Sequence, residues 1–119
     1  MTFARHCLLT AVLLGACAES RTLPADATTP PPDAEIFCRD RETWTCERER
    51  AAGRSTDAEH AQCITDVVPM CNSALWEPGC AATAESTDAC IAALSDASRL
   101  GTPSREIVEC SGDVLCGRR

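Results

Sequence analysis

Two segments of equal length, CRDRETWTC at residues 38–46 and CITDVVPMC at residues 63–71, decide the fold of this chain. Each segment begins and ends with cysteine. Because eight positions along an α-helix make just over two turns, the two cysteines of each segment lie on about the same side of a helix. In an antiparallel helical hairpin the facing cysteines then have residue numbers with the same sum. The predicted bridges are Cys38–Cys71 and Cys46–Cys63.

Local helix signals support this hairpin. Asp33 can cap a helix over residues 34–52, and Gly53 gives that helix a natural end. The run at residues 56–59, Thr-Asp-Ala-Glu, has the pattern of a capping box and predicts the start of a second helix. Pro69 falls inside this second helix, where it lacks the N–H that a helix needs. We therefore expect a kink or an early end at that residue.

The C-terminal half predicts a second, looser hairpin. A third helix is expected over residues 87–100, capped by Ser86 or Thr87 and stopped by Gly101. A short fourth helix then opens at Thr102-Pro103, with proline at its first position. No segment shows the alternation of apolar and polar residues that is typical of a strand. The expected fold class is all-α: a small, disulfide-stapled helical bundle of two helical hairpins and about four helices.

The disulfide pairing of the second half is less constrained than that of the first. One arrangement joins Cys90 to Cys110 and Cys80 to Cys116, which suits a loose hairpin because the two sums of residue numbers are nearly equal. The other arrangement joins neighbours along the chain, Cys80 to Cys90 and Cys110 to Cys116. We prefer the first pairing, and the second stays open at this point.

Composition limits what the folded part can be. The chain has 119 residues, and aromatic side chains make up only 3% of it, so its core is small and needs covalent support. Two of its ten cysteines precede residue 33, and the other eight fit four disulfides in an oxidising compartment. The net charge of −7 and the absence of a basic run argue against nucleic-acid binding.

The N-terminus has the pattern of an export signal. Residues 7–16 form an apolar stretch, shorter than the roughly 20 residues that span a bilayer. This stretch ends in Leu14-Gly15-Ala16-Cys17, which resembles the lipobox of bacterial lipoproteins. The resemblance implies that residues 1–16 are removed and that Cys17 carries acyl chains, palmitate among them, as an anchor. Ala18 then favours the outer membrane, on its periplasmic or cell-surface face. Alternatively, Ala16-Cys17-Ala18 fits the cleavage rule of a soluble secreted protein.

The composition changes after the lipobox. Residues 17–32 are rich in Pro, Thr and Ala, which predicts a flexible tether that is partly polyproline II at residues 30–32. Residues 33–119 contain the paired cysteines and form the Cys-rich helical domain. The expected organisation is therefore a signal peptide, a lipidated tether and one folded domain.

No motif indicates catalysis, a cofactor or a metal, so we expect a protein that is not an enzyme. His60 is expected to be a solvated surface histidine. Zinc binding needs closely spaced thiolates, and the shortest cysteine spacing is Cys110-x5-Cys116. Acids alternate with arginines along the first helix and are expected to form a solvated, charged face rather than an acid–base pair. These residues are Asp40, Glu42, Glu47 and Glu49 with Arg39, Arg41, Arg48 and Arg50.

Three aromatic residues are candidates for packing or for binding. Phe37 and Trp44 lie seven residues apart on one side of the first helix. They form either an exposed patch or, as we expect, a contact with the third helix around Ile91 and Leu94. Trp76 stands in a turn with Pro and Gly and is the best single candidate for an exposed contact with a partner.

The last part of the chain carries a family resemblance. The pattern Trp76-x3-Cys80-x9-Cys90-Ile91-Ala92-Ala93-Leu94, followed by Glu109-Cys110-x5-Cys116, is similar to small Cys-rich lipoproteins of myxobacteria and their relatives. One such group is named for lying near natural-product gene clusters. The resemblance implies a tethered helical envelope protein and supplies no catalytic residue.

These patterns together predict a non-enzymatic role in the cell envelope. We expect a binding or structural module that is anchored in the membrane through lipid on Cys17 and that meets an envelope protein or glycan. The alternative is a small secreted, disulfide-rich inhibitor or effector.

Overall fold

The computed structural model describes residues 29–118, and these residues form an all-α structure without a strand. Three short 3₁₀ turns, Ala97–Arg99, Ser104–Glu106 and Val108–Cys110, separate α3 from α4. The expected fold class is confirmed. The expected signal peptide, the lipobox and most of the tether lie outside the described residues. The α-helices are α1 (Ala34–Ala51), α2 (Asp57–Cys71), α3 (Ala84–Ser95) and α4 (Gly112–Leu115).

The first helix begins and ends where the sequence predicts. The carboxylate of Asp33 accepts a hydrogen bond of 2.9 Å from the backbone N–H of Ile36, as an N-cap does. Gly53 has a φ of +70°, a conformation that stops the helix and that a side chain would disfavour. The chain then turns directly into α2.

The start of α2 is confirmed, whereas of the two outcomes expected at Pro69, a kink or an early end, the early end is wrong. Thr56 and Glu59 form the reciprocal hydrogen bonds of a capping box. The helix continues two residues past Pro69, to Cys71. Pro69 falls in the last turn, so its missing N–H costs one hydrogen bond to the carbonyl four residues earlier but does not end the helix. The N–H of Asn72 closes that turn on the carbonyl of Val68 at 3.0 Å.

The third helix lies further toward the N-terminus than the sequence predicts. Its cap is Thr83 rather than Ser86 or Thr87, because Thr83 and Ser86 satisfy each other's backbone N–H groups. Thr87 is buried inside the first turn. The helix ends at Ser95 instead of Leu100, since Asp96 adopts an extended conformation.

A single fourth helix does not form after Gly101. Pro103 precedes the short turn Ser104–Glu106 instead of opening a helix, and Ile107 has an extended backbone. This extension places the Ile107 side chain in the core with 2% exposure. The prediction of one short helix is therefore wrong, and a series of short turns ending in α4 takes its place.

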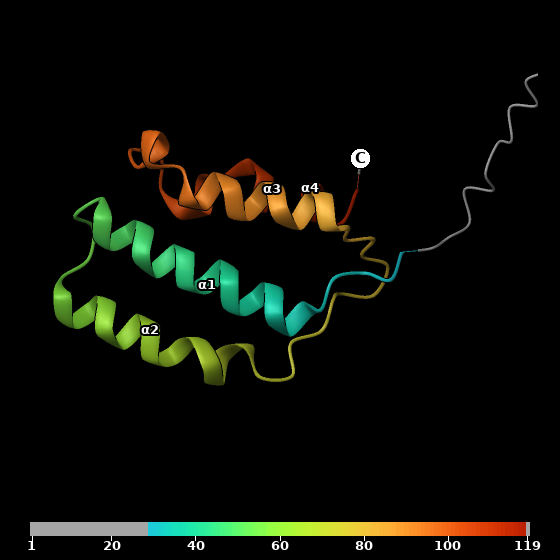
Figure 1. The fold of residues 1–119 in the computed structure, drawn as a ribbon, viewed down its shortest axis with the longest axis horizontal. Coiled ribbons are helices and arrows are strands. Elements are labelled where there is room, and N and C mark those ends of the chain that lie inside the picture. The colour runs from blue at the N-terminus through green and yellow to red at the C-terminus, as the bar shows by residue number, and fades with distance from the viewer. Residues whose placement is uncertain (1–28, 119) are drawn as a thin grey trace, which may run out of the picture.

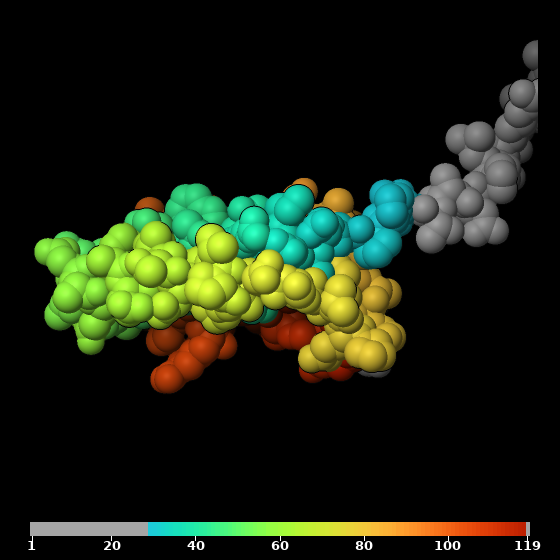
Figure 2. All heavy atoms as spheres, turned by 90° about the horizontal axis from the view of Figure 1, so that it is seen from below, coloured from blue at the N-terminus to red at the C-terminus, as the bar shows by residue number. Residues whose placement is uncertain are grey.

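The three long helices have α1 at their centre (Figure 1). α2 runs antiparallel to α1, as the register of the cysteines requires. α3 runs parallel to α1, because residues 72–83 return the chain to the end where α1 begins (Figure 1). The segment after Gly101 then folds back along α3. In the view of Figure 2, residues 72–83 lie beside residues 29–33, so the chain enters the domain at this end.

The disulfides form two nests. The outer bridge Cys38–Cys71 encloses Cys46–Cys63, which confirms the register argument for α1 and α2. The second nest confirms the pairing that we preferred over the neighbour pairing. It consists of Cys80–Cys116 around Cys90–Cys110.

The buried core is divided in two. The larger cluster lies between α1, α3 and the returning segment, and Phe37, Leu94 and Ile107 belong to it. The smaller cluster lies between α1 and α2 and contains Val67 with the buried bridge cysteines. α2 thus contributes little apolar burial, and its two disulfides are its main attachment. None of the described helices is both long enough and apolar enough to cross a membrane.

Candidate functional site

The most deeply buried charge belongs to Arg48, which the sequence suggested would lie on a solvated face. Its side chain is 2% exposed and sits at the point where α3 ends. The guanidinium donates hydrogen bonds to the carbonyl oxygens of Leu94 at 3.0 Å and of Thr102 at 2.9 Å. Further bonds reach the carbonyls of Ala93, Asp96 and Arg99. The prediction of a uniformly solvated α1 face is therefore wrong at this position.

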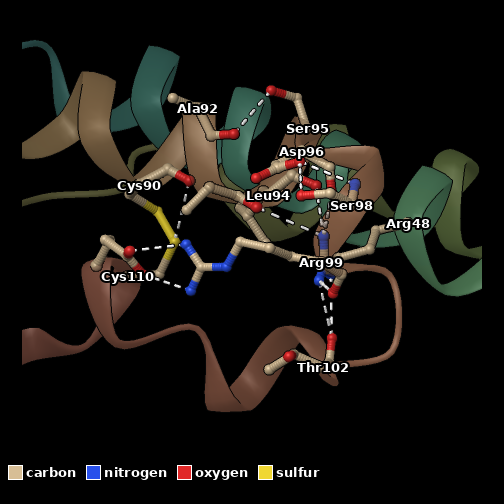
Figure 3. A network of polar contacts seen from close by, with 12 residues as sticks. Arg48, Cys90, Ala92, Leu94, Ser95, Asp96, Ser98, Arg99, Thr102 and Cys110 are labelled. Carbon is tan, nitrogen blue, oxygen red and sulfur yellow. Dashed lines mark hydrogen bonds and ion pairs between the residues drawn. A yellow bond between two sulfur atoms is a disulfide. The ribbon is translucent and has the colours of Figure 1, made fainter.

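The charge of Arg48 is stabilised mainly by hydrogen bonds to backbone carbonyls, and no carboxylate of the described residues forms an ion pair with it. Its nitrogens point into the bend that carries Leu94, Asp96 and Thr102 (Figure 3). The carbonyls at the end of a helix carry partial negative charge, so a cation is favoured there. Arg48 thus acts as a C-terminal cap of α3, supplied from α1, and fixes the two parallel helices against each other.

A second polar contact ties α1 to the returning segment. Glu49 accepts hydrogen bonds from Arg54 and from the backbone N–H of Ser104, the latter at 3.1 Å. The hydrogen bond from Arg54 is the main reason that the pKa of the Glu49 carboxyl falls to about 2. Arg99 and Glu109 form a similar ion pair that lowers the pKa of Glu109. These carboxylates are structural anions that stay charged well below neutral pH.

The remaining charged candidates point in different directions. Glu42 accepts two hydrogen bonds from Arg41, at 2.9 and 2.6 Å. Glu47 lies 3.1 Å from Nε2 of His60, which is partly buried rather than fully solvated. Asp40 is exposed, and no ion pair of the described residues includes it. The structure does not bring the α1 carboxylates together, and the described residues contain no cluster of three or more metal-ligating side chains.

One hollow, of about 230 Å³, lies between the beginnings of α1 and α3. Its largest apolar side chains are Ile36, Phe37 and Ile91, and Pro32 and Ala84 add to the apolar lining. Phe37 is buried, as the sequence predicts, whereas Ile36 is 61% exposed. Asp40 and Asp88 line the same hollow.

A second hollow, of about 240 Å³, lies between the ends of the same two helices. Trp44, Leu94 and Leu100 supply most of its large apolar side chains. Trp44 is 40% exposed and is not among the side chains that pack against the larger core cluster, so its predicted packing against the third helix is not confirmed. The structure thus gives Phe37 and Trp44 different roles, because the first lies in the core and the second lies at the surface.

Both hollows are lined by α1 and α3, and we call the surface between these two helices the α1–α3 groove. Their lining residues on each helix recur at spacings of three and four, the repeat that places residues on one face of a helix. On α1 and its cap these are Asp33, Ile36, Phe37, Asp40, Trp44, Glu47, Arg48 and Ala51. On α3 they are Ala84, Thr87, Asp88, Ile91, Leu94 and Ser95.

The α1–α3 groove has an exposed carboxylate on each of its two helices. Asp40 and Asp88 are exposed, and neither carboxylate belongs to an ion pair or a hydrogen bond within residues 29–118. The one arginine that lines the groove, Arg48, is buried and bonded to carbonyls. By contrast, a hollow of about 260 Å³ on another side of α1 contains Arg41 and Glu42, which already pair with each other.

Trp76 is not the exposed contact that the sequence suggested. Its ring stacks on Phe37 with 5.3 Å between ring centroids, and its indole N–H donates to the carbonyl of Pro32 at 2.6 Å. The residue is therefore a packing residue that joins the 72–83 segment to the start of α1. The stacking partner could not be identified from sequence because it depends on where that segment crosses.

Neither the structure nor the comparisons test the predicted lipoprotein signal at the N-terminus. Cys17, the expected lipidation site, lies outside the described residues. The predicted disulfide cysteines are all paired: Cys38, Cys46, Cys63, Cys71, Cys80, Cys90, Cys110 and Cys116. Comparison with models of protein families, with curated proteins and with solved structures gives no match for this chain.

Proposed function

We propose that the protein is a membrane-tethered, extracytoplasmic lipoprotein that acts as a non-enzymatic binding or structural module of the cell envelope. The observation that carries this proposal is the complete pairing of the cysteines within residues 29–118 into four disulfides. Such use of cysteine is typical of oxidising compartments such as the bacterial periplasm or the cell surface.

The sequence before the domain supplies the proposed means of attachment. The lipobox-like Leu14-Gly15-Ala16-Cys17 offers an acylation site, and the Pro- and Thr-rich stretch that follows suits a spacer. The similarity to small Cys-rich lipoproteins of myxobacteria agrees with this organisation. An outer-membrane location rests on Ala18 and belongs to the same proposal.

The geometry of the domain supports a binding role over a purely inert one. The α1–α3 groove combines exposed apolar side chains, Ile36 and Trp44, with carboxylates that pair with nothing else among the described residues. Surfaces of this kind are common at protein interaction sites. An envelope protein or a glycan is the proposed partner, and the anchor would keep the groove close to the membrane.

Fractionation of cells and the intact mass of the purified protein test this proposal. We expect a chain that begins at Cys17, carries lipid mass, resides in the membrane fraction and gains eight hydrogens on reduction of its four disulfides. Cys17→Ala should release the protein, whereas Cys7→Ala, a matched change before the cleavage site, should not. Membrane retention of Cys17→Ala would refute the anchor.

The same measurement decides the second candidate function. A mature chain that begins at Glu19 and carries no lipid would identify a diffusible secreted protein. The small-residue pattern Ala16-Cys17-Ala18 favours this alternative. The inhibitor or effector role would then be tested by adding the purified protein to a panel of extracellular proteases.

A further inference from the structure

We propose that the α1–α3 groove binds an amphipathic helical segment of a partner protein, and that this segment carries basic residues beside its apolar face. The inference rests on the proposed function and specifies the partner of that binding module. A helix in a groove is a recurring mode of recognition, in which apolar anchors recur along one face of the bound helix.

The spacing of the two hollows fits a helix. One hollow is centred on residues 36–37 of α1 and the other on residues 47–48, eleven residues further along. At a rise of 1.5 Å per residue this separation is about 16 Å, which equals about three helical turns. A partner helix lying along the groove would therefore place two apolar anchors about eleven residues apart, one in each hollow.

The apolar surface of the groove offers contacts for such anchors. Ile36 is 61% exposed and Trp44 is 40% exposed, so the docked helix would remove both side chains from water. Ile91 lines the first hollow together with Ile36, and Leu94 lines the second together with Trp44. An aromatic side chain at the centre of an interface is a frequent source of binding energy.

The charge of the groove determines whether basic or acidic residues are favoured on the partner segment. Asp40 on α1 and Asp88 on α3 both line the hollow near the helix starts, and none of its lining residues within 29–118 is an arginine. Two carboxylates that pair with nothing else in this range, one on each helix, favour lysine or arginine on the facing segment and disfavour acidic residues. The apolar side chains beside these carboxylates also suit a protein segment better than an uncharged glycan.

Binding of synthetic peptides to the oxidised full chain carrying Cys17→Ala, which prevents acylation, tests the proposal. The probe is an Ala-rich helical peptide of about 18 residues, with two Leu anchors eleven positions apart and Lys flanking the first anchor. A second peptide replaces each Lys with Glu. We expect the Lys peptide to bind, to change the fluorescence of the protein through Trp44, and to bind more weakly as salt is raised. The Glu peptide should not bind.

Paired variants locate the site. Asp40→Asn with Asp88→Asn should weaken binding of the Lys peptide about tenfold, which is within the range for two partly exposed charge contacts. The matched control, Asp66→Asn with Asp113→Asn, removes the same charge from α2 and α4 and should change affinity less than twofold. Equal losses in both double variants would mean nonspecific charge attraction and would overturn the proposal.

A second pair of variants tests the apolar anchor. Ile36→Ser should weaken binding about tenfold, because it removes an exposed apolar side chain from the groove. Val68→Ser is the control, since Val68 is similarly exposed, at 58%, but lies on α2. Three results would each refute a basic helical partner. These are unchanged affinity of the Lys peptide for Ile36→Ser, an affinity of the Glu peptide equal to that of the Lys peptide, and no binding of the Lys peptide. Membrane fractionation tests only the attachment through Cys17, whereas peptide binding tests only the groove. Failure of this inference is therefore distinguishable from failure of the proposed function.

Discussion

Replacing Arg48 with Met should destabilise the domain strongly, because among the described residues this side chain is the sole hydrogen-bond donor to the carbonyls of Ala93 and Leu94 at the end of α3. No other hydrogen bond among the described residues reaches the carbonyls of Ala93, Leu94 or Thr102. Ala93 and Leu94 are buried, whereas Thr102 is partly exposed and water can replace its bond. Each buried carbonyl left without a partner costs about 1–3 kcal/mol.

The expected loss for Arg48→Met follows from these two buried carbonyls. Two such groups give about 2–6 kcal/mol, and relief of the desolvation of the charge offsets part of it. We expect the free energy of unfolding to fall by about 3 kcal/mol. At 4–8 °C per kcal/mol, the melting temperature would fall by about 12–24 °C. Guanidinium chloride unfolding followed by circular dichroism, with the disulfides intact, measures the loss.

Arg50→Met is the matched control, because Arg50 lies on the same helix and pairs with Asp57 at the surface. An exposed ion pair of this kind contributes at most about 1 kcal/mol. If Arg48→Met unfolds within 1 kcal/mol of Arg50→Met, the assignment of Arg48 as the cap of α3 is wrong. A changed dependence of the free energy on denaturant would instead indicate an altered unfolded or native state.

Three further predictions concern other parts of the fold. Replacing both Cys46 and Cys63 with Ser should leave the other three bridges intact and lower the free energy of unfolding by about 2–4 kcal/mol. A non-reducing peptide map that shows new cysteine pairings would contradict the register argument. The folded-state pKa of Glu49 lies below its ordinary value, so the ionised carboxylate adds to the free energy of unfolding. This contribution is about 1–2 kcal/mol after solvent screening; it is present above pH 4.5 and is lost as the pH falls toward 2. Glu49→Gln should therefore reduce the acid dependence of the melting temperature, and an unchanged acid dependence would refute the assignment. Trp76→Phe keeps the stacked ring but removes the donor to Pro32, and a loss of about 1 kcal/mol is expected in thermal unfolding; a loss near zero would mean that the hydrogen bond adds nothing.

The first hairpin was predictable because its information is local and periodic. The equal spacing of the cysteines, the Asp33 cap and the Thr56–Glu59 box each act within a few residues, and together they fix the register of α1 and α2. The nested pairing of the later cysteines could also be inferred, because a returning chain brings Cys110 back to Cys90 whether or not it is helical.

The role of Arg48 was hidden by the charges around it. In sequence it resembles Arg50, since both alternate with glutamates. One signal could have separated them: Arg48 falls eleven residues after Phe37 and four after Trp44, on the face that packs against α3. An arginine on an apolar stripe is a candidate for a buried, carbonyl-bonded cation.

The α1–α3 groove was beyond sequence reasoning for a different reason. It exists because α3 runs parallel to α1, and this depends on how residues 72–83 cross the end of the domain. Their path is set by the Trp76–Phe37 stack and by the bond to Pro32, which join residues about forty positions apart. No local pattern specifies contacts of that range.

The two disulfide nests have a consequence for proteolysis and for the order of folding. The first nest closes between residues 38 and 71 and the second between residues 80 and 116, so no covalent crosslink joins one to the other. A single cut in residues 72–79 would leave two fragments associated only through noncovalent contacts between α1 and α3, Arg48 among them. Under the proposed export, which starts at the N-terminus, all four cysteines of the α1–α2 hairpin would reach the oxidising compartment before Cys80, the first cysteine of the second nest.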